Sequence, residues 1–145
     1  MEERSAGAVL FYGDEPDKRR FLLLLNGGRW DFPKGNVETG ESELQTVIRE
    51  VGEETGLTDI SLIPGFRRAI EYSYRREGRK VHKQVVYLLA RTEDCEVRIS
   101  QEHQSFGWFP YAEALQRASY DNSRATLQEA EEFIRTASSR IPSQN

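Results

Sequence analysis

The stretch Gly35–Leu57, GNVETGESELQTVIREVGEETGL, decides the fold of this 145-residue chain. It places a glycine loop before a predicted helix on which Glu50, Glu53 and Glu54 are spaced i, i+3 and i+4. Side chains at that spacing lie on one helix face. Three neighbouring carboxylates repel one another unless a positive charge lies between them. Because Mg²⁺ prefers oxygen ligands and shares them with phosphates, the spacing predicts a site for such a cation.

The ends of this helix are also predicted by local sequence. Ser42 and Gln45 form the pattern of a capping box, and Gly56 can adopt the left-handed conformation that ends a helix. The apolar positions spaced i, i+3, i+4 and i+7 are predicted to face the core, and they are Leu44, Val47, Ile48 and Val51. Periodicity alone would fit a helix with a solvated acidic face equally well.

The spacing of the polar residues is more specific than the periodicity. The stretch matches G-x5-E-x7-R-E-U-x-E-E-x-G-U and resembles the signature of the Nudix hydrolases at every specified position. Those positions hold Gly35, Glu41, Arg49, Glu50, Val51, Glu53, Glu54, Gly56 and Leu57. The resemblance implies an α/β/α sandwich with a mixed β-sheet. It also implies hydrolysis of a phosphoanhydride with Mg²⁺, for which Mn²⁺ can substitute.

The resemblance assigns roles to individual residues. The expected metal ligands are Gly35, Glu50, Glu53, Glu54 and Glu102. The expected catalytic residues are Glu53, Glu54 and Glu102, of which Glu53 or Glu102 acts as the general base. Glu102 lies in a polar loop, SQEHQ, just before a predicted strand. Glu41 and Arg49 are expected to hold the loop and the helix together, and Arg49 is spaced to pair with Glu53.

Segments outside the signature narrow the substrate. They read WDFPKGN from Trp30, GFRR from Gly65, a tyrosine at position 72, KQVVYLLA from Lys83 and EHQSFGW from Glu102. Their order resembles the asymmetrical diadenosine tetraphosphate hydrolases, a Nudix subfamily. That resemblance implies off-centre cleavage of a dinucleoside polyphosphate, which for diadenosine tetraphosphate gives ATP and AMP. WDFPKGN is also similar to segments of other microbial Nudix enzymes that act on nucleotides or inositol pyrophosphates.

The same resemblance predicts how the substrate is held. Lys83, inside a predicted strand, and Lys34, just before the glycine loop, are expected to bind phosphate. Tyr72 and Phe106 are expected to stack on the two sides of an adenine ring, each stack contributing about 1–3 kcal/mol. Core packing is the competing interpretation for every aromatic residue in the chain.

Two other functions remain open from sequence. One is a different Nudix pyrophosphohydrolase, acting on ADP-ribose, an oxidised nucleotide, an RNA 5′ end or an inositol pyrophosphate. The other is a Nudix-like nucleotide sensor without turnover. Sensors tend to have degenerate signatures, and the signature of this chain is intact.

Composition fits a small nucleotide enzyme. We expect one domain over residues 1–145, with a flexible tail from about residue 138. The net charge of −4 argues against a stable nucleic-acid partner. No apolar run could span a membrane, and the acidic start MEERSAGAVLFYG does not fit a signal peptide. With Cys95 as the only cysteine, no internal disulfide can form, and a cytoplasmic location is expected.

Alternation and turn signals predict the remaining elements. The predicted strands are Ala6–Tyr12, Arg20–Leu25, Ile60–Ile63, Phe66–Arg75, Val81–Arg91 and Phe106–Phe109, with a short extended piece at Trp30–Lys34. The two strands around Glu77-Gly78 should form a long hairpin. Helices are predicted at Tyr111–Ala118 and Arg124–Ala137.

Overall fold

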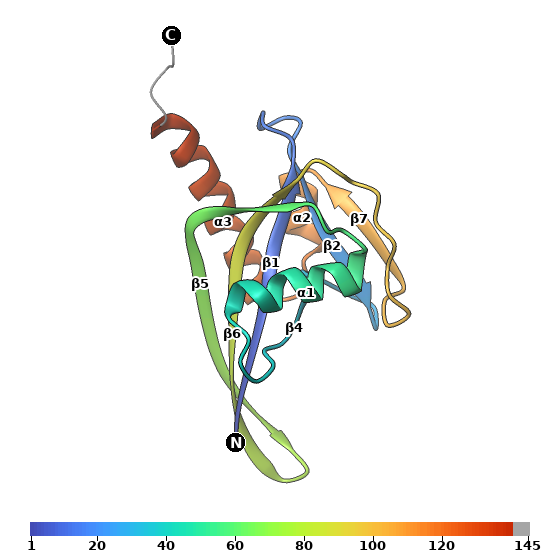
Figure 1. The fold of residues 1–145 in the computed structure, drawn as a ribbon, viewed down its shortest axis with the longest axis vertical. Helices are drawn as coiled ribbons and strands as arrows, with labels where there is room; N and C mark the ends of the chain where they lie inside the picture. The colour runs from blue at the N-terminus through green and yellow to red at the C-terminus, as the bar shows by residue number, and fades with distance from the viewer. Residues whose placement is uncertain (141–145) are drawn as a thin grey trace.

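The computed structural model describes residues 1–140 and shows a twisted sheet between helices (Figure 1). In chain order the elements are β1 (Glu2–Tyr12), β2 (Arg20–Asn26), β3 (Arg29–Asp31), β4 (Lys34–Asn36), α1 (Glu43–Thr55), β5 (Ile60–Arg76), β6 (Arg79–Thr92), β7 (Ser105–Phe109), α2 (Tyr111–Arg117) and α3 (Asp121–Arg140). The predicted strands and helices are therefore all present, with shifted boundaries.

The sheet is mixed, as predicted. Its strand order is β3-β2-β1-β6-β5, with β4 also paired to β1 and β7 also paired to β2. β1 runs parallel to β6, and the other pairings are antiparallel. The β5–β6 hairpin extends beyond the body of the sheet, beside the N-terminus (Figure 1). It turns at Glu77 and Gly78, both of which have positive φ.

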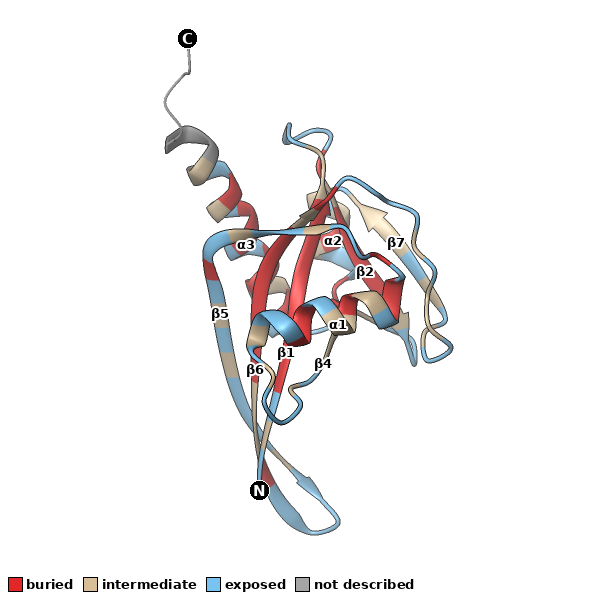
Figure 2. Cartoon of the chain, viewed as in Figure 1, coloured by how far each residue is buried: buried red, intermediate tan, exposed pale blue. Residues whose placement is uncertain are grey.

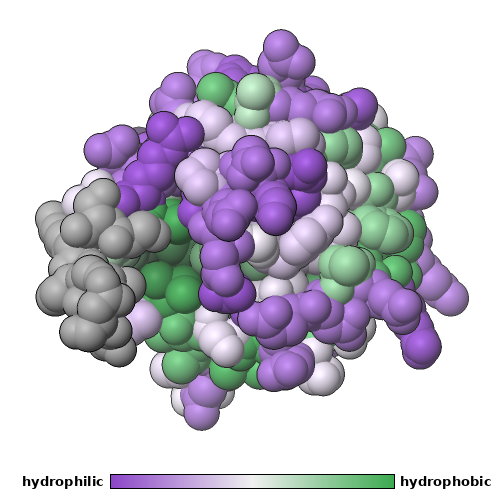
Figure 3. All heavy atoms as spheres, turned by 90° about the horizontal axis from the view of Figure 1, so that it is seen from above, coloured by the Kyte–Doolittle hydropathy of each residue, from purple (hydrophilic) through white to green (hydrophobic). Residues whose placement is uncertain are grey.

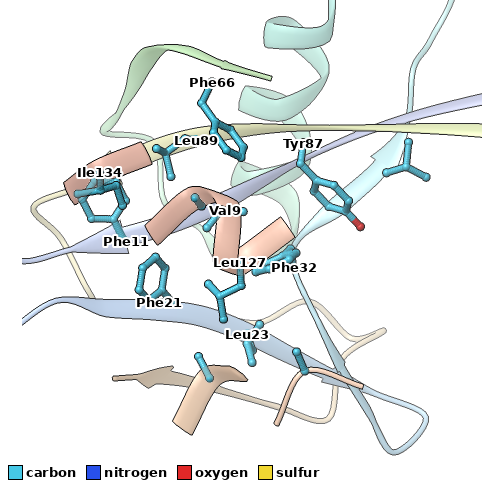
Figure 4. Close-up of a cluster of buried hydrophobic side chains, with 14 residues drawn as sticks. Val9, Phe11, Phe21, Leu23, Phe32, Phe66, Tyr87, Leu89, Leu127 and Ile134 are labelled. Carbon is cyan, nitrogen blue, oxygen red and sulfur yellow. The ribbon is translucent and has the colours of Figure 1, made fainter. Parts of the chain in front are cut away.

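Helices cover both faces of the sheet, which confirms the predicted α/β/α sandwich. Val47 and Val51 of α1 pack against one face, in a cluster with Leu10, Leu22 and Leu88. On the other face, α2 and α3 close a cluster that is rich in aromatic residues (Figure 4). Its labelled members are Val9, Phe11, Phe21, Leu23, Phe32, Phe66, Tyr87, Leu89, Leu127 and Ile134. Figure 2 shows the buried residues concentrated in the middle of the sheet, while the hairpin tip is exposed.

The buried stripe of α1 differs from the prediction. Val47 and Val51 are fully buried, but Leu44 and Ile48 are 38% and 48% exposed. The helix is rotated so that a partly polar side, including Thr46, Glu54 and Thr55, faces inward instead. The predicted capping box of Ser42 with Gln45 and the left-handed Gly56 are both confirmed.

The boundaries of three other elements differ from the predicted ones. The predicted extended piece Trp30–Lys34 is divided, because β3 pairs with β2 while β4 pairs with β1. The two strands predicted between positions 60 and 75 form one strand, β5, with an irregularity between Leu62 and Arg67. α3 continues to Arg140, so the predicted tail is helical at its start, and the rest of that tail lies outside the described residues.

A buried ion pair ties α3 to the sheet. Arg19, next to β2, donates from Nη1 to both carboxylate oxygens of Glu131 at 2.7 and 3.2 Å. Both side chains are almost completely buried. The end of the molecule opposite the hairpin tip is mostly hydrophilic, with smaller hydrophobic areas between the polar side chains (Figure 3). Within residues 1–140, none of the helices combines the length and apolar character needed to cross a bilayer.

The rotation of α1 gives a direct stability test. Val51→Ala should lower the free energy of unfolding by about 2 kcal/mol, because it removes buried methyl groups and leaves a cavity. Ile48→Ala is the matched control, and it should change the free energy by less than about 0.5 kcal/mol because the side chain is half exposed. Denaturant unfolding of both variants measures this difference. Equal destabilisation by the two changes would contradict the rotation.

Candidate active site

The glycine loop brings the chain against the middle of α1. A Cβ atom at Gly35 would overlap the carboxylate of Glu50, so only glycine lets that carboxylate lie against β4. The capping box begins α1 directly after the loop, with the N–H of Gln45 donating to Ser42 Oγ at 3.1 Å. The close approach of β4 and α1 therefore explains why the signature begins with glycine.

Arg49 joins the loop, β4 and the helix. Its Nε donates to Glu41 at 2.7 Å, its Nη1 to Glu50 at 2.6 Å and its Nη2 to the carbonyl of Asn36 at 2.9 Å. The predicted contact with Glu53 is present but longer, at 3.4 Å. The Arg49 guanidinium lowers the pKa of Glu41 to about 2, so that carboxylate stays charged. These contacts place Arg49 and Glu41 as links between chain segments.

Glu54 is the most perturbed acid of the group. Its side chain points into the protein, and burial raises its pKa to about 9, with further contributions from the hydrogen bond to Glu50 and the charges of Glu50 and Glu102. The backbone N–H of Lys34 acts in the opposite direction. Two acids that share a proton mark a place where negative charge is in excess. This arrangement fits a bound cation, which would replace the proton.

The loop between β6 and β7 completes the group. Its backbone donates from Arg98 to the carbonyl of Thr55 at 2.8 Å and from Ser100 to the carbonyl of Glu54 at 3.2 Å. These bonds bring His103 over the helix, with its Nε2 3.3 Å from Glu54 Oε1 and its Nδ1 2.8 Å from Ser100 Oγ. Burial lowers the pKa of His103, which favours the neutral ring. The contact between His103 and Glu54 was not predicted, because it depends on how the loop before β7 folds back on α1.

A cavity of about 720 Å³ brings most of the predicted residues together. Its lining includes Lys34, Gly35, Glu50, Glu53, Glu54 and Glu102 from the prediction. Within residues 1–140, no three acidic, histidine or cysteine side chains form a ready-made set of metal ligands. Arg49 holds Glu50 in this structure, and Glu50 and His103 hold Glu54. The carboxylates are thus gathered, and a cation would have to compete with these contacts.

A smaller cavity of about 300 Å³ adjoins the first. Both are lined by Asp31, Lys34 and Tyr120. The remaining walls of the smaller cavity come from β5, β6 and the start of α3, and consist of Ile70, Tyr72, Tyr87, Asn122 and Ser123. Lys83 pairs with Tyr72 across β5 and β6, and its ammonium lies 3.8 Å from Glu3. Aromatic side chains therefore line a hollow directly beside the carboxylate cavity.

Phe106 does not lie with Tyr72, which corrects the predicted pair. Phe106 is opposite Leu24, a member of the cluster under α1. Tyr72 is opposite Lys83, which is two residues from Val85 in the cluster on the α3 side. Because paired residues share a face and alternate residues lie on the same face, Tyr72 and Phe106 are on opposite faces of the sheet.

Tyr120, which the sequence analysis did not name, lies with Tyr72 at the smaller cavity. It lines both cavities and is 41% exposed, as is Tyr72. Arg29 lies over its ring at 5.5 Å from the centroid. Little in the sequence indicated a binding role for Tyr120, because an aromatic residue just before a helix more often packs than binds a ligand.

The structure is an α/β/α sandwich with a cavity lined by carboxylates, and comparison with known proteins names the family. The NUDIX domain model matches residues 1–130. The chain therefore belongs to the Nudix family. The mouse asymmetrical bis(5′-nucleosyl)-tetraphosphatase is 42% identical, with 92% of this chain and 97% of the mouse protein covered.

Solved structures agree with this assignment. A binary complex of the Caenorhabditis elegans Ap4A hydrolase superposes with a TM-score of 0.79 at 30% identity, covering 92% of this chain and 98% of that one. The Escherichia coli dihydroneopterin triphosphate pyrophosphohydrolase has a TM-score of 0.71 at 19% identity, covering 92% and 95%, and shows the shared fold alone.

The raised pKa of Glu54 predicts a stability effect without metal. Between its unfolded value of 4.5 and its folded value of about 9, the folded state keeps a proton that the unfolded chain has lost. Stability should therefore fall as pH rises through that range. Glu54→Gln mimics the protonated acid, so in chelator it should raise the Tm at pH 8, with a smaller gain at pH 5.

Thermal unfolding at both pH values measures this effect. Glu53→Gln is the control, because the side chain of Glu53 is largely in solvent and its replacement should shift the Tm little. A gain for Glu54→Gln that is the same at pH 5 and pH 8 would contradict the assignment.

Proposed function

We propose that this protein hydrolyses diadenosine tetraphosphate to ATP and AMP, as an asymmetrical bis(5′-nucleosyl)-tetraphosphatase. The observation that carries the proposal is the pair of joined cavities, one rich in carboxylates and one lined by tyrosines. A nucleotide has the same two parts, a polyphosphate and a base. The 42% identity to the mouse enzyme of that name supports the same substrate.

We propose Mg²⁺ as the cofactor, with Mn²⁺ as a substitute. Glu50 and Glu54 would hold it, together with Glu53, Glu102 and the carbonyl of Gly35. When bound, a divalent cation neutralises phosphate oxygens and makes a water molecule more acidic. Glu53 or Glu102 would accept the proton of the attacking water, since both line the cavity and neither is held by the short contacts that restrain Glu50.

Lys34 fits the phosphate chain between the two cavities, whereas Lys83, the second proposed phosphate ligand, lines neither of them. Lys34 lines both cavities, and its ammonium lies 3.3 Å from Asp31. Lys83 is mostly buried, and burial lowers its pKa despite the opposing charge of Glu3. A polyphosphate reaching from the glutamates towards the tyrosines would pass Lys34 and exchange its Asp31 partner for phosphate oxygens. Lys83 is opposite Tyr72 in the sheet, and we propose that it binds a phosphate near that tyrosine.

The base fits between Tyr72 and Tyr120. Both rings are partly exposed at the smaller cavity, which suits a planar ligand that stacks on aromatic faces. This assignment replaces the earlier pair of Tyr72 and Phe106.

The alternative functions would use the same two cavities in different ways. Another Nudix pyrophosphohydrolase would use the carboxylates without requiring two nucleosides, and a sensor would bind nucleotide without turnover. The complete signature and its assembled carboxylates favour an enzyme. We further propose that the protein acts in the reducing cytoplasm. The free, exposed Cys95 is consistent with that location.

A substrate panel with resolved products tests the proposal. With Mg²⁺, the wild type should convert diadenosine tetraphosphate to equimolar ATP and AMP, and it should prefer this substrate to ADP-ribose and to 5′-triphosphorylated RNA. A chelator should abolish turnover. Glu54→Gln should lower kcat by at least about 100-fold, because a neutral amide is a poor cation ligand. Two ADP molecules as products, or full activity of Glu54→Gln, would refute the assignment.

Loss of the base stack should appear mainly in KM. Tyr72→Ala and Tyr120→Ala should each raise KM for diadenosine tetraphosphate by about 5- to 100-fold, because a stack contributes about 1–3 kcal/mol. kcat should fall less, since the stack is present in both ground and transition states. Tyr72→Phe should recover most of the loss. Phe106→Ala is the comparison, and a larger effect there than at Tyr120 would return Phe106 to the site. Circular dichroism of each variant checks that it is folded.

A further inference from the structure

Tyr87 of β6 has a buried ring and an unpaired hydroxyl. Its side chain is 1% exposed, and its ring packs edge-on against Phe32 at 5.4 Å within the aromatic cluster. Figure 4 shows its hydroxyl pointing away from the centre of that cluster. Among residues 1–140, this hydroxyl has no hydrogen-bond partner. The ring is buried, but the hydroxyl oxygen is not sealed in the core: it reaches the surface of the smaller cavity, where a ligand can bond to it.

The hydroxyl belongs to the wall of the smaller cavity. Tyr87 lines that cavity together with the two tyrosines proposed to hold the base. The cavity's acidic group is already engaged, because Asp31 Oδ1 accepts from the Phe32 N–H at 2.8 Å and from Ser123 Oγ at 2.7 Å, while Oδ2 lies near Lys34. The hydroxyl of Tyr87 therefore faces the cavity, and no other described group of the protein uses its hydrogen-bonding capacity.

We propose that the Tyr87 hydroxyl binds the polar edge of the nucleobase, so that Tyr87 is a specificity-determining residue at the floor of the base cavity. The inference rests on the proposed function, because it assumes that the smaller cavity holds a base. Stacking on Tyr72 and Tyr120 recognises any flat ring and carries little information about its edge. A hydrogen bond at the edge distinguishes a nucleobase from a purely apolar ring.

The chemistry of a phenol suits this role. Its oxygen accepts from an exocyclic amino group, and its O–H donates to a ring nitrogen or a carbonyl oxygen. Burial raises the pKa of Tyr87, so the proton needed for donation stays in place. The ring packed on Phe32 also fixes the direction of the hydroxyl before the ligand binds, which lowers the entropy lost on binding.

The Tyr87→Phe variant separates this role from simple packing. Phenylalanine keeps the ring and removes only the unpaired hydroxyl, so the Tm without nucleotide should be unchanged or higher. Tyr87→Phe should raise KM for diadenosine tetraphosphate about five-fold, which corresponds to about 1 kcal/mol, with kcat nearly unchanged. The Kd for AMP measured in chelator should rise by a similar factor.

Tyr111→Phe is the matched control. Tyr111 is a partly buried tyrosine that packs on Phe21 and lines neither cavity. Its variant should keep the wild-type KM and the wild-type Kd for AMP. An unchanged Kd for AMP in Tyr87→Phe would overturn the inference, as would an equal change in both variants. Failure of the wild type to cleave diadenosine tetraphosphate would count against the proposed function alone, because AMP binding still reports on Tyr87.

Discussion

The guanidinium of Arg49 is the contact on which the site depends. It binds a carboxylate in the loop, a carboxylate on its own helix and a backbone carbonyl of β4. Arginine suits this position because its planar fork directs several donors at once. The contact holds Glu50 over Gly35, where no other residue leaves room for a carboxylate. The spacing of the signature thus places the Arg49 guanidinium among carboxylates that would otherwise repel one another.

A second constraint acts at the other end of the helix. The loop before β7 continues the hydrogen bonding of α1 through the carbonyls of Glu54 and Thr55. It thereby delivers His103 to the side of the helix where Glu54 is buried. Glu54 is left with more negative charge around it than the protein compensates, and a proton makes up the difference. The site is therefore prepared for positive charge by segments about fifty residues apart in sequence.

Sequence predicted what is local and missed what depends on packing. Capping residues and the spacing of acids on one helix are set within a few turns, so Ser42, Gly56 and the glutamates were placed correctly on α1. The prediction that Leu44 and Ile48 are buried was wrong, because the rotation of a helix depends on what it packs against. Phe106 and Tyr72 lie on different faces because strand register decides which face a side chain occupies, and a sequence does not state register. Tyr120 was missed because only the tertiary fold brings the start of α3 beside β5.

The division into two cavities allows the residues around one cavity to change during evolution without changing the carboxylates of the other. The smaller cavity is formed largely by β5, β6 and the start of α3, whereas the carboxylates lie on α1 and the loop before β7. Within residues 1–140, Tyr72, Tyr87 and Asn122 form no hydrogen bond or ion pair with Arg49 or Glu50. Under the proposed function, substitutions at those three positions would alter the preferred base while the carboxylates stay in place. Such an arrangement lets descendants of one ancestral gene acquire new substrates by exchanging a few side chains on one wall.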